Sequence, residues 1–159
     1  MGSDKIHHHH HHMRTLNKDE HNYIKQIANI HETLLSQVES NYKCTKLSIA
    51  LRYEMICSRL EHTNDKIYIY ENEGQLIAFI WGHFSNEKSM VNIELLYVEP
   101  QFRKLGIATQ LKIALEKWAK TMNAKRISNT IHKNNLPMIS LNKDLGYQVS
   151  HVKMYKDID

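Results

Sequence analysis

The segment from Tyr97 to Ala108 constrains the fold of this chain more than any other part of the sequence. A β-type run, Val91 to Val98, ends at a proline, and a short basic loop containing Gly106 then leads into an amphipathic helix. The first backbone N–H groups of a helix have no partner within the helix and lie at the positive end of its dipole. Arg103 and Lys104 add positive charge, and a glycine lets the backbone approach an anion closely. The segment therefore predicts a cradle for a pyrophosphate group.

The N-terminus carries six consecutive histidines, so we interpret residues 1–12 as an expression tag and residues 13–159 as a single domain. No apolar run is long enough to span a bilayer and nothing resembles a signal peptide. We therefore expect a cytoplasmic protein with no membrane partner. Cys44, Cys57 and the scattered histidines lack the spacing of metal ligands, so we also expect no metal.

The formal net charge is +4, and much of the positive charge lies between residues 103 and 126. A basic region beside a phosphate-type loop favours an anionic ligand. Lys112, Lys117 and Lys120 within it are more typical of a solvated helix face. Aromatic residues are not interleaved with the basic ones, so we expect no nucleic-acid partner.

Hydrophobic periodicity predicts an alternating series of strands and helices. An Asn72-Glu73-Gly74 hairpin turn joins the second and third strands. The second helix carries an apolar stripe formed by Leu47, Leu51, Met55 and Leu60. In chain order we expect a strand at 13–16, helices at 16–40 and 46–62, strands at 66–71, 75–85 and 90–98, a helix at 106–122, a strand at 125–131, a helix at 135–145 and a last strand from Tyr147. This order predicts an α/β domain with one mixed sheet and helices on its faces.

Two common nucleotide cradles are excluded by the glycine pattern. Outside the tag the only glycines are Gly74, Gly82, Gly106 and Gly146, too far apart for a dinucleotide fingerprint or a P-loop. The run Arg103-Lys104-Leu105-Gly106-Ile107-Ala108 instead resembles the Gln/Arg-x-x-Gly-x-Gly/Ala signature of the GCN5-related N-acetyltransferase (GNAT) superfamily. Downstream, Asn135-Leu136-Pro137-Met138 and Leu145-Gly146-Tyr147 resemble the second cofactor segment of that family.

The resemblance implies a GNAT fold, with a central mixed, mostly antiparallel and splayed sheet flanked by helices on both faces. It also implies an N-acetyltransferase that moves an acetyl group from acetyl-CoA to a primary amine of a small molecule by direct transfer in a ternary complex. The acceptor would be an amino acid, a polyamine or an amino sugar. A peptide or protein amine, or a CoA-binding module without activity, are the alternatives.

The resemblance also implies which residues hold acetyl-CoA. The strand backbone at Leu96, Tyr97 and Val98 would pair with the pantetheine arm, and Asn135 would bond the pantetheine or a phosphate. Taken singly, Tyr97 is better explained as a core side chain and Asn135 as a helix cap, and only the motifs together favour the cofactor roles. The diphosphate would be held by the loop and first helical turn, at Arg103, Lys104, Leu105, Gly106, Ile107, Ala108 and Thr109.

Acetyl transfer to an amine requires a base for the amine proton and hydrogen-bond donors for the oxyanion. Glu94 is the candidate base, because a carboxylate among apolar strand residues is costly unless it is solvated, paired or functional. The competing explanation for Glu94 is that the alternation of side chains along the strand simply points it to solvent. His132 is a weaker candidate for the base. A backbone N–H near Leu96 or Val98 would stabilise the oxyanion.

The chain departs from the family pattern at the residue expected to protonate the CoA thiolate as it leaves. Many relatives carry a tyrosine where this chain has Asn142, and an amide does not donate a proton at neutral pH. Tyr147, Tyr97 or water would then protonate the thiolate, or it would leave unassisted, while Asn142 would orient the sulfur. The tail after Gly146 is short, so the acceptor site is expected to be more open or to be completed by a second subunit in a homodimer.

Overall fold

The computed structural model describes residues 11–158. It divides into two compact units, one ending at Asn129 and the other beginning at Thr130. Residues 1–10 of the expected tag lie outside the described residues, and its last two histidines begin the first strand. The elements of the first unit, in chain order, are β1 (His11–Thr15), α2 (His21–Val38), α3 (Lys46–His62), β2 (Asp65–Asn72), β3 (Gln75–Ser85), β4 (Met90–Val98), the 3₁₀ turn η1 (Pro100–Phe102), α4 (Ile107–Thr121) and β5 (Arg126–Asn129).

The five strands form one open sheet in the order β1-β2-β3-β4-β5. The first three pairings are antiparallel, and β4 and β5 run parallel. The expected hairpin between β2 and β3 is confirmed. Glu73 and Gly74 both have positive φ, 50° and 77°, which a two-residue type I′ turn requires. The sheet is therefore mixed and mostly antiparallel, as the sequence predicts.

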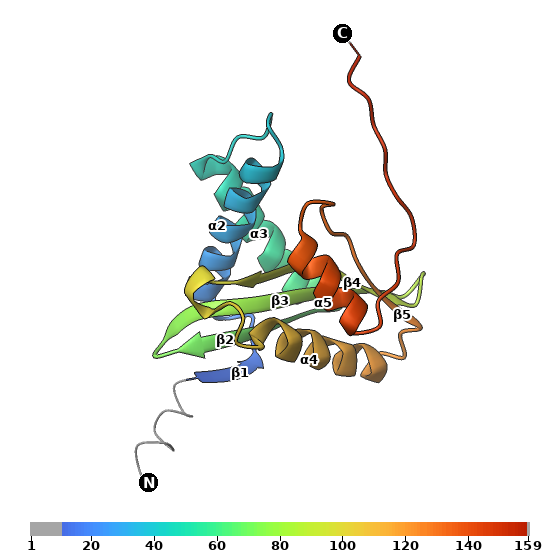
Figure 1. Cartoon of the computed structure of the whole chain (residues 1–159). Helices are drawn as coiled ribbons and strands as arrows, with labels where there is room; N and C mark the ends of the chain where they lie inside the picture. Colours follow the sequence, from blue (N-terminus) through green and yellow to red (C-terminus); the bar gives the residue numbers. More distant parts are fainter. Residues whose placement is uncertain (1–10, 159) are drawn as a thin grey trace. The chain divides into compact units, whose positions relative to one another are not determined.

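Helices cover both faces of this sheet (Figure 1). On one face, Ile24 and Ile27 of α2 and Ile56 of α3 form a core with strand side chains that include Phe79 and Trp81. On the other face, α4 packs close to β3. A Cβ built at Gly82 would lie 2.7 Å from the Cδ1 of Leu115, so glycine is what allows this approach. The sheet thus has one face under α2 and α3 and another under α4.

The stripe predicted for the second helix is only partly correct. Leu47 and Leu51 are exposed, whereas Ile56 is fully buried. The start of α3 is well capped, because Thr45 and Ser48 exchange side-chain and backbone hydrogen bonds in a capping box. The cap therefore holds the first residues of the helix, and contacts with the core begin at Ile49.

Over residues 130–158, the second unit contains a single helix, α5 (Leu136–Asp144). It ends before Gly146, whose φ of 92° only glycine adopts easily. The strand expected from Tyr147 is wrong, because residues 147–158 form no strand in the described part of the chain. A β-type sequence needs a partner strand to satisfy its backbone groups, and no pairing with this segment is found among residues 11–158.

The interpretation of Lys112 as a solvated residue is also wrong, since its exposed fraction is 0%. Burial lowers the pKa of Lys112 to about 8, while the charge of Glu116 acts in the opposite direction. Below pH 8 the folded protein must therefore carry a buried charge. This penalty is relieved as the pH rises from about 8 towards the ordinary lysine value near 10.5.

We expect this burial to appear as a pH dependence of stability. Relative to a Lys112→Met variant of similar size, the wild-type free energy of unfolding should rise by about 1 kcal/mol between pH 7 and pH 9. Urea denaturation of both proteins at the two pH values measures the difference. If the difference in free energy of unfolding between wild type and Lys112→Met is the same at pH 7 and pH 9, Lys112 has an ordinary pKa in the folded state.

No helix among residues 11–158 is long and apolar enough to cross a bilayer. In the same part of the chain, no group of three or more histidine, cysteine, aspartate or glutamate side chains is arranged to hold a metal ion.

Candidate active site

The loop before α4 has the geometry of an anion cradle. Lys104 and Gly106 take left-handed conformations, with φ of 65° and 84°, and turn the chain into the helix. Gly106 is the N-cap, no side chain caps the helix, and the first turn contains no acidic residue. The Gly106 carbonyl accepts from the Gln110 N–H at 3.1 Å, so the N–H groups of residues 107–109 precede the first intrahelical bond. These donors and the exposed basic loop suit a phosphate.

Beside this loop, β4 has an open edge. Its pairing with β5 runs only from Met90 to Ile93, so within the described residues the rest of β4 pairs with β3 alone. The Glu99 N–H donates to the Ile77 carbonyl at 2.8 Å, so Glu99 is bonded to β3 through its backbone. In an antiparallel pair only every second residue points its backbone N–H and C=O groups at the partner strand. The N–H and C=O groups of Leu96 and Val98 therefore point away from β3. The splayed strand expected from the resemblance is therefore found as an interrupted pairing.

Two of the predicted cofactor residues use this edge differently from expectation. The Arg103 Nε donates to the Val98 carbonyl at 2.8 Å, so this side chain closes part of the edge itself. By the same alternation Tyr97 faces β3 with its backbone, and its ring packs against Phe79 with centroids 6.1 Å apart. Burial, together with the charge of Glu99, raises the pKa of the Tyr97 phenol, which therefore keeps its proton at neutral pH.

Glu94 is the extra residue of a β-bulge. The register of β3 against β4 passes from Trp81 opposite Leu95 directly to Gly82 opposite Ile93, which leaves Glu94 without a partner. Leu95 packs against the core under α2 and α3, and Glu94 contacts Arg59 of α3 on that same face. The simple alternation that would send Glu94 to solvent is therefore broken.

The Glu94 carboxylate is half-buried, and one of its oxygens is bound more closely than the other. Arg59 Nη2 donates to Glu94 Oε1 at 2.5 Å, and the Asn92 amide donates to Oε2 over a longer 3.3 Å. Asn92 in turn accepts from the Ser128 hydroxyl of β5 at 3.0 Å. Oε2 is thus the less committed oxygen and lies beside the point where β4 and β5 part.

Arg59 is held in place by Asp65, whose side chain is completely buried. Asp65 Oδ2 contacts Arg59 Nε at 3.1 Å and accepts from the Trp81 indole at 2.6 Å, while His83 Nδ1 lies 2.7 Å from Oδ1. The Arg59 guanidinium also stacks over the Trp81 ring at 4.9 Å. Arg59 and Asp65 were not predicted from the sequence, since no local motif marks them and only the fold brings them to the bulge.

The remaining predicted residues lie in the second unit. Asn135 is the N-cap of α5, where its side chain accepts from the Met138 N–H at 3.3 Å, so the capping explanation is confirmed for this residue. Asn142 lies in the last turn of α5, and its backbone carbonyl accepts from the Tyr147 N–H at 2.8 Å. His132 is exposed, and its ring accepts from the backbone of Asn134 at 3.2 Å. The structure describes these residues without testing their expected roles in transfer.

Comparison with known proteins agrees with this geometry. The family model described as acetyltransferase (GNAT) family matches residues 27–147. An N-alpha-acetyltransferase of Sulfurisphaera tokodaii is 27% identical over 133 residues, covering 75% of this chain and 79% of that protein.

Solved structures show the same fold. A Pyrococcus furiosus protein assigned as an acetyl transferase has a TM-score of 0.70 and 22% identity, covering 92% of this chain and all of that one (100%). An aminoglycoside acetyltransferase from an uncultured soil metagenomic sample, solved with sisomicin, has a TM-score of 0.70 and 12% identity, covering 95% and 98% of the two chains.

Proposed function

The chain belongs to the GNAT acetyltransferase family, and from this premise we propose that it transfers an acetyl group from acetyl-CoA to a primary amine of a small molecule. The observation that carries the proposal is the open edge of β4 directly beside the uncapped start of α4. An edge strand offers unpaired amide groups to a peptide-like ligand, and a helix start offers donors to phosphate. Acetyl-CoA carries both kinds of group, because its diphosphate is joined directly to the pantetheine arm that contains the amides.

In the proposed complex, the diphosphate of acetyl-CoA contacts the backbone N–H groups of residues 104–109. Arg103 and Lys104 supply charge there. The amides of the pantetheine arm pair with Leu96 and Val98, which requires the Arg103 side chain to leave the Val98 carbonyl. The thioester then lies along β4 towards Glu94, because the pantetheine follows the open edge from the loop back to the bulge.

The chemistry assigned to this chain is general-base catalysis and oxyanion binding. A primary amine is mostly cationic at neutral pH, so one proton must leave before its nitrogen attacks the thioester carbonyl. Glu94 Oε2 receives that proton, directly or through water, while a backbone N–H of Leu96 or Val98 donates to the oxyanion. The carbon–sulfur bond then breaks, the nitrogen loses its second proton, and the thiolate of CoA takes up a proton directly from that nitrogen or through water.

A peptide N-terminus is the second candidate acceptor. It is favoured by the similarity to the Sulfurisphaera tokodaii N-alpha-acetyltransferase. An α-amine at a peptide N-terminus has a lower reference pKa than an alkyl amine, so its deprotonation demands less of Glu94.

A thiol-release screen with acetyl-CoA separates these functions. We expect release of CoA thiol that depends on an added amine, with small amines used at higher kcat/KM than peptides. The panel should include an amino acid, a polyamine, an aminoglycoside and short peptides with free N-termini, each product being confirmed by mass spectrometry. A preference for peptides would favour the second candidate, and acetyl-CoA binding without acetylation of any amine would identify a binding module.

A further inference from the structure

The face of the sheet under α2 and α3 carries more acid than base around Glu94. Glu32 is paired with Arg52, and Asp65 and Glu94 are both paired with Arg59. Three carboxylates thus face two guanidiniums, which leaves these five side chains with a sum of −1. Burial alone would raise the pKa of Glu32, but hydrogen bonds from Tyr42, Ser48 and Arg52 bring it below the ordinary value, so Glu32 is ionised at neutral pH.

Both guanidiniums on this face are already committed to carboxylates of the chain. Arg52 places Nε at 3.0 Å and Nη2 at 2.9 Å from Glu32 Oε2. Arg59 divides its donors between Asp65 and Glu94. A substrate carboxylate would have to displace one of these partners, because an arginine binds a carboxylate best with two parallel N–H groups. This arrangement argues against Arg52 as a recognition group for an amino acid.

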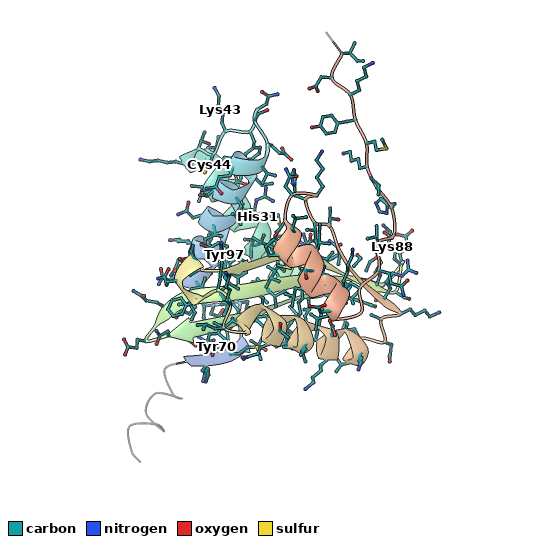
Figure 2. The ribbon with its side chains drawn as sticks, viewed as in Figure 1. His31, Lys43, Cys44, Tyr70, Lys88 and Tyr97 are labelled. Carbon is teal, nitrogen blue, oxygen red and sulfur yellow. The ribbon has the colours of Figure 1, made fainter. Side chains whose placement is uncertain are left out.

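Hydrogen-bond acceptors, in contrast, remain available on this face. His31 of α2 stands edge-on to Trp81, with ring centroids 5.9 Å apart and planes at 89°, and Figure 2 shows it on the side of the sheet where α2 and α3 lie. Within the described residues its Nδ1 is buried without a partner. Burial, with Arg52 acting in the same direction, lowers the pKa of His31 to about 4, although Glu32 and Glu94 oppose the shift. The imidazole is therefore neutral. A chain of contacts links it to Glu94, because Trp81 packs against both His31 and the Arg59 guanidinium that binds Glu94.

We propose that the acceptor is a cationic amine without a neighbouring carboxylate, whose ammonium group is received between Glu94 and His31. An ammonium group has three N–H donors and no acceptor, which matches an ionised carboxylate and the lone pair that His31 presents at Nδ1 in the tautomer with its hydrogen on Nε2. A carboxylate beside the amine would meet the excess negative charge, and both guanidiniums among the described residues of this face, Arg52 and Arg59, are already paired. The inference rests on the proposed acetyl transfer and narrows its substrate class by excluding free amino acids.

Matched pairs of acceptors test this inference at pH 8 and saturating acetyl-CoA. The pairs are tyramine with tyrosine and alaninamide with alanine. Tyramine is more basic than tyrosine and alaninamide is less basic than alanine, so amine basicity acts in opposite directions in the two pairs. We expect kcat/KM to be at least about tenfold higher for the carboxylate-free member of both pairs. Equal or faster use of the carboxylate member in either pair would overturn the inference and leave acetyl transfer intact, whereas no acetylation of any amine would overturn the proposed function.

Two variants test whether the carboxylates on this face cause the preference for carboxylate-free acceptors. Glu32→Gln frees Arg52 from its charged partner, so the preference for carboxylate-free acceptors should fall severalfold. Glu61→Gln is the matched control, because Glu61 forms an exposed ion pair with Lys18 at 2.9 Å and its loss should leave the preference unchanged. Circular dichroism and acetyl-CoA affinity establish that each variant is folded. A folded Glu32→Gln protein with an unchanged preference would contradict the assignment.

His31→Phe keeps an aromatic edge against Trp81 and removes the nitrogen acceptor. We expect the KM for tyramine to rise about tenfold, the loss typical of one hydrogen bond to a charged group, while the Kd for acetyl-CoA stays constant. A purely structural role for His31 would change both constants or neither, and that outcome would remove His31 from the acceptor site.

Discussion

Glu94→Gln is expected to lower kcat/KM for amine acetylation about 10²- to 10⁴-fold at pH 7, the usual contribution of a positioned general base. Glutamine has nearly the same shape, and its amide oxygen can still accept the hydrogen bond that Arg59 Nη2 gives to Oε1. The bulge and its contacts should therefore survive, and the loss should fall on proton removal. Steady-state kinetics with the best acceptor from the thiol-release screen measure the effect.

The pH profile distinguishes loss of the base from loss of amine binding. Without a base, the variant depends on amine that is already neutral, and this fraction grows as the pH approaches the reference value of about 10 for an alkyl amine. The deficit of Glu94→Gln should therefore shrink as the pH rises from 7 to 9, with Glu61→Gln as a control of unchanged rate. A variant that transfers acetyl at the wild-type rate at pH 7 would exclude Glu94 as the base.

The elements around the loop before α4 were predictable because the sequence patterns that indicate them are local. The limits of α3 and β3 and the turn at Gly106 follow from periodicity and from a backbone conformation that glycine adopts easily. The helix start and its charge also lie in one continuous segment. For this reason the turn and the helix start could be located from the sequence, while their role as an anion cradle stays a prediction.

The acceptor side of the site was not predictable in the same way. The bulge at Glu94 arises from the register of β4 against β3, which a pattern within one strand does not contain. Arg59 and Asp65 meet Glu94 only through the packing of α3 on the sheet. His31 fits the apolar stripe of α2, and its isolated position in the sequence gave no sign that it faces Trp81.

Burial also depends on neighbours that composition does not identify. A lysine on an amphipathic helix is usually solvated, yet Lys112 is completely buried in this fold. In the opposite sense, Leu47 and Leu51 have the right spacing for a core stripe and are exposed. Periodicity thus finds a helix reliably, while the partner elements decide which of its faces is covered.

Gly106→Val should weaken acetyl-CoA binding by at least about tenfold, because the cradle depends on the backbone shape at this residue. A β-branched residue at a φ of 84° costs on the order of 1–3 kcal/mol, so the loop is expected to relax away from the geometry that presents its N–H groups. A Cβ at this position meets nothing within 4 Å, so the effect does not come from a clash inside the free protein. Isothermal titration calorimetry with acetyl-CoA measures the change in Kd.

Gly74→Val is the matched control for this prediction. Gly74 has a similar φ of 77°, and a Cβ there also meets nothing within 4 Å, but the residue belongs to the hairpin between β2 and β3. Both variants should therefore lose comparable stability in thermal unfolding, and only Gly106→Val should lose affinity for acetyl-CoA. Equal affinities of the two folded variants would mean that the turn into α4 does not hold the diphosphate. The turn into α4 and the open edge of β4 are proposed to bind the same acetyl-CoA molecule. Equal affinities would therefore also remove the support for placing the thioester beside Glu94.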